Sequence, residues 1–454
     1  MPSDRLTQDQ RIRLHVVLIT LACFLLASTG WLLWLYHLTG LVDASSVDML
    51  TMVVGYLMQA AGIGAFMFFE RGASESNIRC MVVFSTAAYV ACLVPAALSP
   101  SLAPVLAFGY LASLFCGYMQ GFYVYCIARH VDKNHRGLVF GGAYAASTAL
   151  GWLLSAIAGG MLTRSLTGLV TCAVLTVPTV LLVREPLPST PPEADPQPRE
   201  PVNSHLAALA CVTVLLMSLT KNTGFGFPAN DLLEGISVES SRLFYGVGLL
   251  AAGLVTDRDR RFGALCCAGA LVTPFLMLAL SGAAAPATIM WALGYLLFGF
   301  FSVFRVVLLA DLAADANLPL YAGSGLLFGR IGDALGTALT SGLAGSPLVL
   351  ITVTAALFAC TMALFFALYQ QLYVTAQTAA PSEREIFERF AARHDLSSRE
   401  REVLRLVLAE RSNSEIAAEL FVSEATIKYH VRNLLRKTGC RNRLEILAKY
   451  SEPE

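Results

Sequence analysis

Near its middle the chain carries a proline-rich segment that reads Arg184-Glu-Pro-Leu-Pro-Ser-Thr-Pro-Pro-Glu-Ala-Asp-Pro-Gln-Pro-Arg-Glu-Pro-Val-Asn-Ser204. Seven prolines in these 21 residues preclude a helix and favour an extended, polyproline-like chain. Long apolar runs lie on both sides of the segment. It therefore predicts a linker at 184–204 that joins an apolar half at 1–183 to a second apolar half at 205–374.

The composition indicates a chain that spans a membrane many times. Of the 454 residues, 56% are hydrophobic and only 14% are charged, and the mean hydropathy is +0.62. Because about a quarter of the residues of a soluble protein are charged, these values exclude an ordinary soluble enzyme and predict the lipid bilayer as a partner. The predicted spans lie at 14–37, 47–69, 78–98, 102–127, 137–161, 166–183, 205–223, 240–256, 262–281, 286–309, 321–344 and 347–373.

The basic residues of the loops predict the orientation of these twelve spans. If the amino terminus is inside, the inner segments carry thirteen basic residues, which are Arg5, Arg11, Arg13, Arg71, Arg79, Arg129, Lys133, Arg136, Arg184, Arg199, Arg258, Arg260 and Arg261. The outer loops carry three, which are Arg164, Lys221 and Arg242. The inner loop at 310–320 has none and departs from this trend. The positive-inside rule predicts a protein of the cell (cytoplasmic) membrane with both termini in the cytoplasm.

Short matches between the two apolar halves predict an internal repeat. Gly137-Leu-Val-Phe-Gly141 in the fifth span resembles Gly325-Leu-Leu-Phe-Gly329 in the eleventh, at an offset of 188 residues. Gly109-Tyr-Leu111 and Gly294-Tyr-Leu296 match at an offset of 185. The glycines of the fifth and eleventh spans are spaced either for tight helix packing or for an interface that slides.

The order of six spans, a long inner loop and six more spans resembles the major facilitator superfamily. Asp257-Arg258-Asp-Arg260-Arg261, which follows Gly253, is similar to the inner-loop motif of that family. The corresponding loop after the second span, Phe69-Glu70-Arg71-Gly72, keeps little of the motif. The resemblance covers roughly 14–374 and implies an all-α bundle of six plus six helices.

Charged residues within the spans are candidate ligand contacts, because a charge in lipid is costly. Arg330 and Asp333 are three residues apart in the eleventh span and share one helix face. Arg305 lies in the tenth span and Lys221 ends the seventh. Two interpretations remain open: these side chains pair with one another and only fix the packing, or they contact a small-molecule ligand.

No motif in the sequence indicates an enzyme. The eleven cysteines contain no Cys-x-x-Cys pair, and there is no Ser/His/Asp or metal-ligand cluster and no phosphate-binding Gly-x-x-x-x-Gly-Lys. We therefore expect no catalytic residues, no metal and no cofactor.

After the last span the composition changes to that of a soluble domain. Residues 381–454 contain 14 Lys or Arg and 13 Asp or Glu. An amphipathic helix with Ile386, Phe387 and Phe390 on one face is predicted in a connector at 375–396. Capping boxes at Ser397-Ser-Arg-Glu400 and Ser412-Asn-Ser-Glu415 predict two helix starts. Ser423 is expected to cap a third helix at 424–437, and a fourth is expected at about 442–450.

The third of these helices has the charge pattern of a DNA-binding helix. From Ala425 to Leu444 there are six basic residues and no acidic one. Lys428, Arg432 and Arg436 form one stripe, whereas Ile427, Val431 and Leu434 form an apolar stripe on the other side. A short helix, a tight turn and such a helix predict a helix-turn-helix domain at 397–454 that binds double-stranded DNA.

Leu396-Ser-Ser-Arg-Glu400, Ser412-Asn-Ser-Glu415-Ile-Ala417 and Val422-Ser-Glu-Ala-Thr426-Ile-Lys428-Tyr-His430-Val-Arg432 closely resemble the LuxR-type DNA-binding domain over about 395–452. The resemblance implies that Lys428, Tyr429 and Arg432 face base edges. It implies further that Thr426, His430 and Lys437 lie near phosphates, and that the helix around Leu444, Ile446 and Leu447 forms a homodimer surface. Ser423 and Arg436 complete the candidate DNA-binding set. Glu410 stands where the family commonly has a glycine.

Two functions from different classes follow from this organisation. The first is a membrane-embedded one-component transcriptional regulator, whose bundle senses an unknown small-molecule signal and whose carboxyl-terminal domain binds promoter DNA. The second is a transporter of the major facilitator type with a DNA-binding tail that couples flux to transcription. A bundle that serves only as a passive anchor is a third possibility.

Overall fold

The computed structural model describes residues 7–43, 46–47, 49–157, 165–187, 204–223, 238–273, 275, 284–375 and 383–451. Most of the predicted linker and part of the predicted span at 262–281 lie outside these residues. The chain divides into two compact units, Met1–Leu372 and Tyr373–Glu454. The described residues form helices and no strand, so the predicted all-α class is confirmed.

Each predicted span overlaps a helix of the first unit, and the span at 262–281 does so only over residues 262–270. The helices are α1 (Gln8–Thr39), the π-helical turn η1 (Met49–Val54) with α3 (Gly55–Phe69), α4 (Glu75–Leu98), α5 (Leu102–His130), α6 (Arg136–Ile157), α7 (Ser165–Arg184), α8 (Ser204–Asn222), α9 (Val238–Arg258), α10 (Arg260–Ala270), α12 (Ala284–Asp315), α13 (Ser324–Gly342) and α14 (Pro347–Tyr369) with η6 (Gln370–Thr375). Short 3-10 turns, η2 (Lys133–His135) and η5 (Pro319–Gly323), precede α6 and α13.

Nine helices among the described residues are long and apolar enough to cross a membrane. The helices α9, α10 and α13 do not belong to this group, and α10 is described over only 11 residues. The first unit is therefore a polytopic membrane bundle, and the number of twelve spans stays a prediction.

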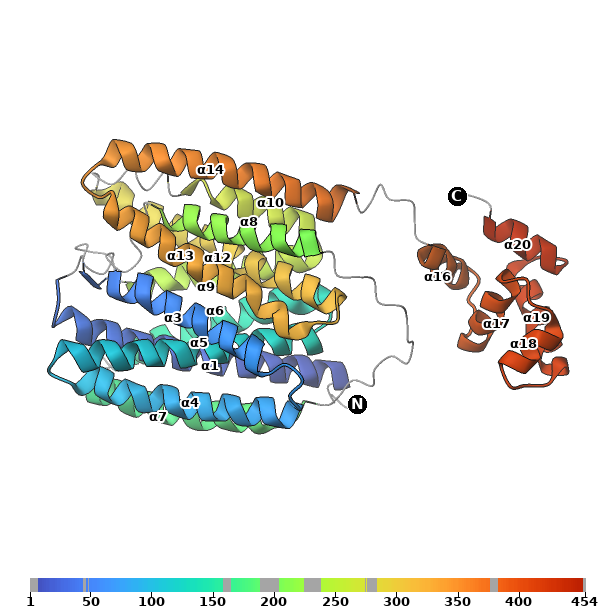
Figure 1. Ribbon diagram of the computed structural model, residues 1–454, viewed down its shortest axis with the longest axis horizontal. Coiled ribbons are helices and arrows are strands. Elements are labelled where there is room, and N and C mark those ends of the chain that lie inside the picture. Colours follow the sequence, from blue (N-terminus) through green and yellow to red (C-terminus); the bar gives the residue numbers. More distant parts are fainter. Residues whose placement is uncertain are drawn as a thin grey trace. The chain divides into compact units, whose positions relative to one another are not determined.

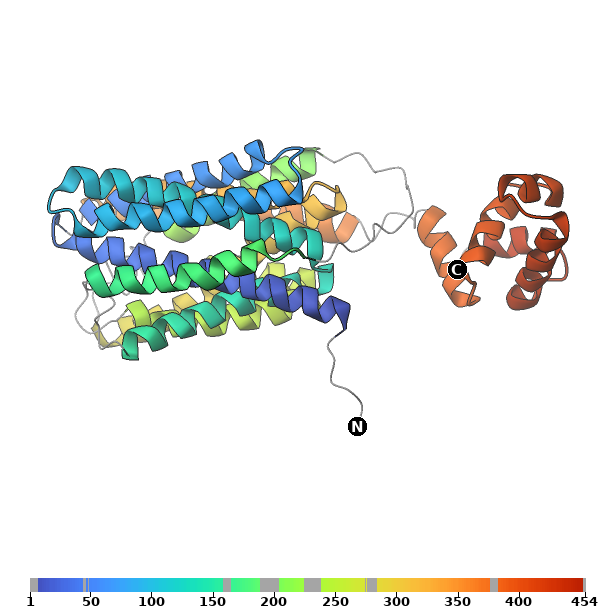
Figure 2. The same ribbon diagram turned by 90° about the horizontal axis from the view of Figure 1, so that it is seen from below.

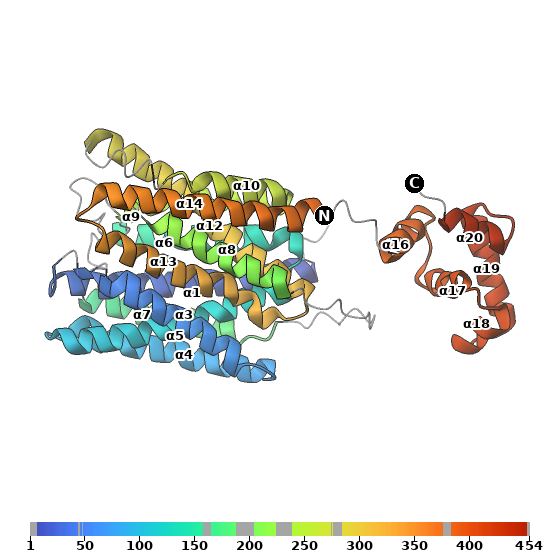
Figure 3. The same ribbon diagram turned by 45° about the horizontal axis from the view of Figure 1, so that its top comes forward.

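The helices of the bundle run along one common direction, with α4 and α7 at one edge and α10 and α14 at the opposite edge (Figures 1 and 3). The view from below shows the same bundle (Figure 2). Two pairs of helices join the halves: α6 packs on α9, and α13 packs on α3. Each pair combines a fifth helix of one half with a second helix of the other, which is the exchange that an internal repeat produces.

Glycines permit close approach of backbones at these crossings. A Cβ atom on Gly137 would lie 2.8 Å from the carbonyl oxygen of Gly253, and one on Gly141 would overlap the carbonyl oxygen of Leu249. In α13, by contrast, a Cβ atom on Gly325 would overlap the carbonyl oxygen of Arg305 in the same half. Gly137 and Gly141 of α6 thus serve the contact between the halves, whereas Gly325 serves packing within one half.

The second unit is a small helical domain with a core of its own. Its helices are α16 (Glu383–Arg393), α17 (Ser398–Leu408), α18 (Asn413–Glu419), α19 (Glu424–Thr438) and α20 (Arg443–Ser451). The core contains Val403, Leu404, Ile416, Ile427 and Leu434, all fully buried. The amphipathic connector helix belongs to this unit, because Phe387 and Phe390 of α16 pack in the same core.

We predict that Gly62→Ala destabilises the bundle. Gly62 of α3 faces α5, and a Cβ atom there would overlap the carbonyl oxygen of Leu114. The carbonyl oxygen belongs to the backbone of α5, so the added methyl group fits only if α3 and α5 move apart. The free energy of unfolding should therefore fall by about 1–3 kcal/mol. Thermal unfolding in detergent measures this effect as a lower Tm.

The matched control is Gly64→Ala in the same helix. Its Cβ atom would meet only Leu327 Cδ1, at an ordinary 3.5 Å. We expect an unchanged or slightly higher Tm, since alanine is favoured over glycine within a helix. Equal losses for the two variants would contradict the close contact of α3 with α5.

Candidate nucleic-acid interface and ionic sites

Three serine caps set where the helices of the second unit begin. The backbone N–H of Ser397 donates to Glu400 Oε2 at 2.8 Å, and that of Ser412 donates to Glu415 Oε2 at 2.7 Å. Each serine hydroxyl accepts in return from the N–H three residues on. Ser423 Oγ accepts from the N–H of Thr426 at 3.2 Å. The three helix starts predicted from these serines are confirmed, and α18 and α19 form a helix-turn-helix.

One face of α19 is buried and the opposite face is basic and exposed. Ile427 and Leu434 are fully buried, whereas Lys428, Arg432 and Arg436 are exposed. The Nζ atom of Lys428 lies 2.9 Å from Glu424 one turn earlier. Both side chains of that pair are about half exposed, so the pair adds little stability.

The other predicted DNA contacts of α19 lie beside this basic stripe. Tyr429 is 53% exposed, and the guanidinium of Arg432 lies 5.7 Å from the centre of its ring. The hydroxyls of Ser423 and Thr426 are 2.7 Å apart at the start of the helix. His430 is partly buried, and its Nδ1 has no hydrogen-bond partner among the described residues. The structure thus brings the predicted base-reading residues together on one exposed surface.

Lys437, predicted near phosphate, lies in an internal ion pair. Its Nζ atom is 2.7 Å from Glu400 Oε2 and also donates to the carbonyl oxygen of Asp395 at 2.7 Å. Burial by itself raises the pKa of Glu400, but hydrogen bonds from Lys437 and Ser397 outweigh burial and hold it below its usual value. Lys437 therefore positions α19 against α17, and it must leave Glu400 to reach a phosphate. No local spacing links these two residues in the sequence, so sequence reasoning missed the pair.

Positive φ angles follow four helices of this unit, at Asp395, Glu410, Phe421 and Gly439. Gly439 adopts φ +71° after α19, in the left-handed conformation that glycine tolerates. Glu410, at the position where the LuxR resemblance expects glycine, adopts φ +57° after α17. Glutamate is strained there, because its Cβ atom disfavours that backbone region.

Only part of the predicted dimer surface is exposed. On α20, Leu444 is 75% exposed, whereas Ile446 is fully buried in the domain core. Leu447 is partly buried. A contact through this helix would therefore rest on Leu444 and its exposed neighbours and not on Ile446.

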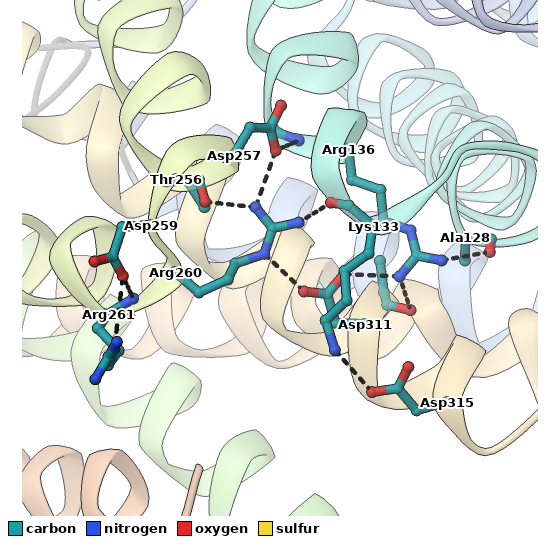
Figure 4. A network of polar contacts seen from close by, with 12 residues as sticks. Ala128, Lys133, Arg136, Thr256, Asp257, Asp259, Arg260, Arg261, Asp311 and Asp315 are labelled. Atoms are coloured by element: carbon teal, nitrogen blue, oxygen red, sulfur yellow. Dashed lines mark hydrogen bonds and ion pairs between the residues drawn. The ribbon is translucent and has the colours of Figure 1, made fainter. Parts of the chain in front are cut away.

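An ionic junction joins the two halves of the bundle where three predicted inner loops meet (Figure 4). Asp311 of α12 accepts from Arg136 of the first half at 2.7 Å and from Arg260 of the second half at 2.8 Å. Arg260 also donates to the carbonyl oxygen of Lys133. Both oxygens of the buried Asp311 carboxylate are thereby paired with cations.

Asp257 of the sequence motif caps a helix of the other half. Its carboxylate accepts the backbone N–H groups of Gly137 and Leu138, at 2.7 and 2.6 Å, at the start of α6. A negative charge is favourable at a helix amino terminus. The corresponding loop of the first half, at 69–72, contacts the second half through Arg71, whose guanidinium lies over the ring of Tyr321, 5.4 Å from its centre.

The four charged residues considered either as partners of one another or as ligand contacts come together in the bundle. Lys221 Nζ lies 2.8 Å from Asp333 Oδ1, and Arg305 and Arg330 lie 3.2 and 3.8 Å from Asp333 Oδ2. The guanidinium of Arg330 also stacks on Tyr56 of the first half, 4.4 Å from the ring centre. No local sequence signal marked Tyr56, because its partner lies in the other half of the chain.

The described residues contain no group of three or more His, Cys, Asp or Glu that could hold a metal ion. All eleven cysteines are free, and most are buried. Small buried thiols of this kind behave as ordinary apolar side chains.

Comparison with known families identifies the second unit. Residues 394–449 match the family model described as "Bacterial regulatory proteins, luxR family". The spore germination protein GerE of Bacillus subtilis is 37% identical over 60 residues, which are 13% of this chain and 81% of that protein. The chain belongs to the luxR family of bacterial regulatory proteins.

Other luxR-family relatives match in the same part of the chain. A nitrate/nitrite response regulator protein homolog of Haemophilus influenzae is 46% identical over 57 residues, or 13% of this chain and 27% of that protein. The nitrate/nitrite response regulator protein NarP of Escherichia coli is 44% identical over 61 residues, or 13% of this chain and 28% of that protein. The chain spans only about a quarter of the length of these two regulators.

The bundle has the fold of the major facilitator superfamily. The human organic anion transporter MFSD10 superposes with a TM-score of 0.57 at 16% identity, covering 79% of this chain and 100% of that chain. The transporter FucP, in an outward conformation, gives 0.56 at 13% identity, covering 78% and 97%. The protein therefore combines a luxR-family DNA-binding domain with a bundle of this transporter fold.

We predict that Glu400→Gln destabilises the luxR-family unit at neutral pH. The loss of the charged acceptor of Lys437 should lower the free energy of unfolding of a 373–454 fragment by about 1–3 kcal/mol. The folded pKa of Glu400 is depressed, so its contribution is present above the ordinary glutamate pKa of about 4.3 and is lost as pH falls through the folded pKa. Urea unfolding should therefore separate wild type from variant at pH 7 and much less in acid.

Glu402→Gln is the matched control, because Glu402 pairs with Arg399 on the surface, with 46% and 36% exposed side chains. We expect a change below about 1 kcal/mol at either pH. A gap between wild type and Glu400→Gln that stays constant with pH would contradict the assigned pair.

Proposed function

We propose that the protein is a membrane-embedded one-component transcriptional regulator. Its bundle senses a small-molecule signal, and its carboxyl-terminal unit binds promoter DNA sequence-specifically. The observation that carries this proposal is the union, in one chain, of a luxR-family DNA-binding unit and a polytopic bundle. Everything in this chain before Tyr373 belongs to the bundle unit, so within the chain the signal has to be received there.

In this proposal α19 enters the major groove of DNA. Lys428, Tyr429 and Arg432 contact base edges, while Thr426, His430, Ser423 and Arg436 lie near phosphates. The exposed basic stripe opposite the buried Ile427 and Leu434 supports this orientation. Lys437 joins the phosphate contacts only if its pair with Glu400 opens.

The bundle lies in the cytoplasmic membrane with both termini in the cytoplasm. The thirteen basic residues of the predicted inner segments, against three outside, support this orientation. The structure supports it further, because loops around Lys133, Arg260 and Asp311 meet at one end of the bundle, as loops on one side of a membrane must.

A signal acts by its different affinities for two arrangements of the bundle. Binding between the halves shifts one half against the other, and α14 and η6 carry the shift to the connector. The connector then changes the placement of two DNA-binding units, which bind as a homodimer to half-sites about one helical turn apart. The packing of α16 in the core of the DNA-binding unit supports this coupling, since α16 and that unit must move together.

A transporter with a DNA-binding tail is the second candidate function. The transporter fold of the bundle favours it, as do the buried charges around Asp333. Uptake of a solute by reconstituted protein, abolished by Arg330→Ala or Asp333→Ala, would support transport. A protein that switches a promoter without moving solute would support the sensor.

For DNA binding, we predict that Lys428→Ala in a 381–454 fragment weakens binding at a target site by roughly 1–3 kcal/mol and relaxes its specificity. Genome-wide occupancy of the intact protein supplies the target sequence, and fluorescence anisotropy measures the affinity. Arg405→Ala is the control, because Arg405 carries the same charge with a similar exposure but faces Glu388 of α16. Equal losses on target and unrelated DNA would refute base contact by Lys428.

For sensing, we predict that replacing residues 1–374 with an unrelated membrane anchor abolishes the response of target promoters to conditions. DNA occupancy should persist, because the DNA-binding unit has its own core. A promoter reporter and chromatin immunoprecipitation measure the two properties separately. A chimera that still responds would show that the bundle is a passive anchor.

A further inference from the structure

The bundle concentrates buried positive charge around Asp333. Lys221, Arg305 and Arg330 converge from α8, α12 and α13 on this one carboxylate, of which only 2% is exposed. Asn222 donates to the backbone carbonyl of Asp333 at 2.8 Å and holds α8 against α13. The cluster thus lies within the packing of three helices of the second half.

The carboxylate of Asp333 does not satisfy the arginines. Lys221 occupies one carboxylate oxygen at 2.8 Å, so two arginines share the other. Arg305 makes one hydrogen bond to it at 3.2 Å, and Arg330 at 3.8 Å is beyond hydrogen-bond distance. The Nε atoms of both arginines are buried without a hydrogen-bond partner among the described residues. Cations buried in this way are unfavourable unless another anion reaches them.

Arg330 packs the face of its guanidinium against the first half. Its guanidinium face stacks on Tyr56, and Tyr123 and Tyr144 also lie within electrostatic range. Stacking uses the face of the guanidinium and leaves the N–H groups at its edge available. The side chain keeps 17% of its surface exposed, more than Arg305 or Asp333 in the same cluster.

We propose that Arg330 and Arg305 form a binding site for a small anion, bearing a carboxylate or phosphate group, between the two halves of the bundle. A planar guanidinium edge binds such a group through two parallel hydrogen bonds. Tyr56 of the first half and Phe301, 5.2 Å from the Arg305 guanidinium, supply aromatic walls. Because the anion contacts both halves, its affinity depends on their arrangement. The inference deepens the proposed sensor function by naming the class of its signal, and it rests on that function only for the step from binding to transcription.

The test measures thermal unfolding of the purified full-length protein in detergent, at constant ionic strength. The probes are inorganic phosphate, acetate and benzoate, with chloride as the reference and neutral benzamide as the uncharged analogue of benzoate. We expect at least one of the three anions to raise the Tm of wild type in a saturable manner. Arg330→Gln should weaken its binding roughly 30-fold or more, because a charged donor is lost from a buried site. Arg305→Gln is the second variant, which keeps the test decisive if Arg330→Gln does not fold.

The matched control is Arg129→Gln, which removes the same charge from the same unit at an exposed pair with Glu75. It should bind the anion as wild type does. The inference is overturned if none of the three anions stabilises wild type beyond chloride, if benzamide stabilises as well as benzoate, or if the folded arginine variants bind as wild type. Phosphate without carboxylate binding, or the reverse, supports the site and identifies the group that it takes.

DNA binding by the same preparations separates this inference from the proposed function. Anion binding without target-site binding by the full chain would retain the site and refute the regulator. Target-site binding and promoter switching without anion binding would retain the regulator and refute the site.

Discussion

The carboxylate of Asp311 joins the two halves at one end of the bundle. It accepts from Arg136 of one half and Arg260 of the other, and all three side chains are largely buried. In a medium without water, a buried charge is tolerable only when such partners satisfy it. The constraint explains why α6, α10 and α12 approach one another there, and why Gly137 lies beneath the neighbouring Asp257. On the other side of the repeat, among the described residues, Arg71 of the first half lies over the ring of Tyr321 of the second half.

The need to pair buried charges is met fully at Asp311 and incompletely at Asp333. At Asp311 both oxygens and both arginines are paired, so the site is complete as it stands. At Asp333 one carboxylate serves three cations, and Arg330 makes no hydrogen bond to a described residue. A complete site fixes structure, whereas an incomplete one favours an added anion. The luxR-family unit repeats the contrast, because Lys437 is paired internally while Arg432 and Arg436 face solvent.

Much of the fold and of the DNA interface could be predicted, because local signals specify them. The caps at Ser397, Ser412 and Ser423 act within one helical turn, and each predicted helix start is confirmed. The apolar stripe through Ile427 and Leu434 repeats with helical spacing and is buried. The predicted dimer surface included Ile446, which lies in the domain core. The sequence of one short helix does not show which of its apolar side chains the rest of the domain covers.

By itself the sequence determined the all-α class, the membrane character of the first unit, the luxR-family domain and the shared face of Arg330 and Asp333. All of these depend on composition or on residues within a few turns of one another. Only the tertiary structure decided which distant partner each charge meets: Arg136 for Asp311, Tyr56 for Arg330 and Glu400 for Lys437. These pairs lie 175, 274 and 37 residues apart in the chain, and no local periodicity extends that far. The partner of each charged residue depends on which helices pack together. That packing is determined by the burial of apolar surface and the pairing of buried charges over the whole molecule.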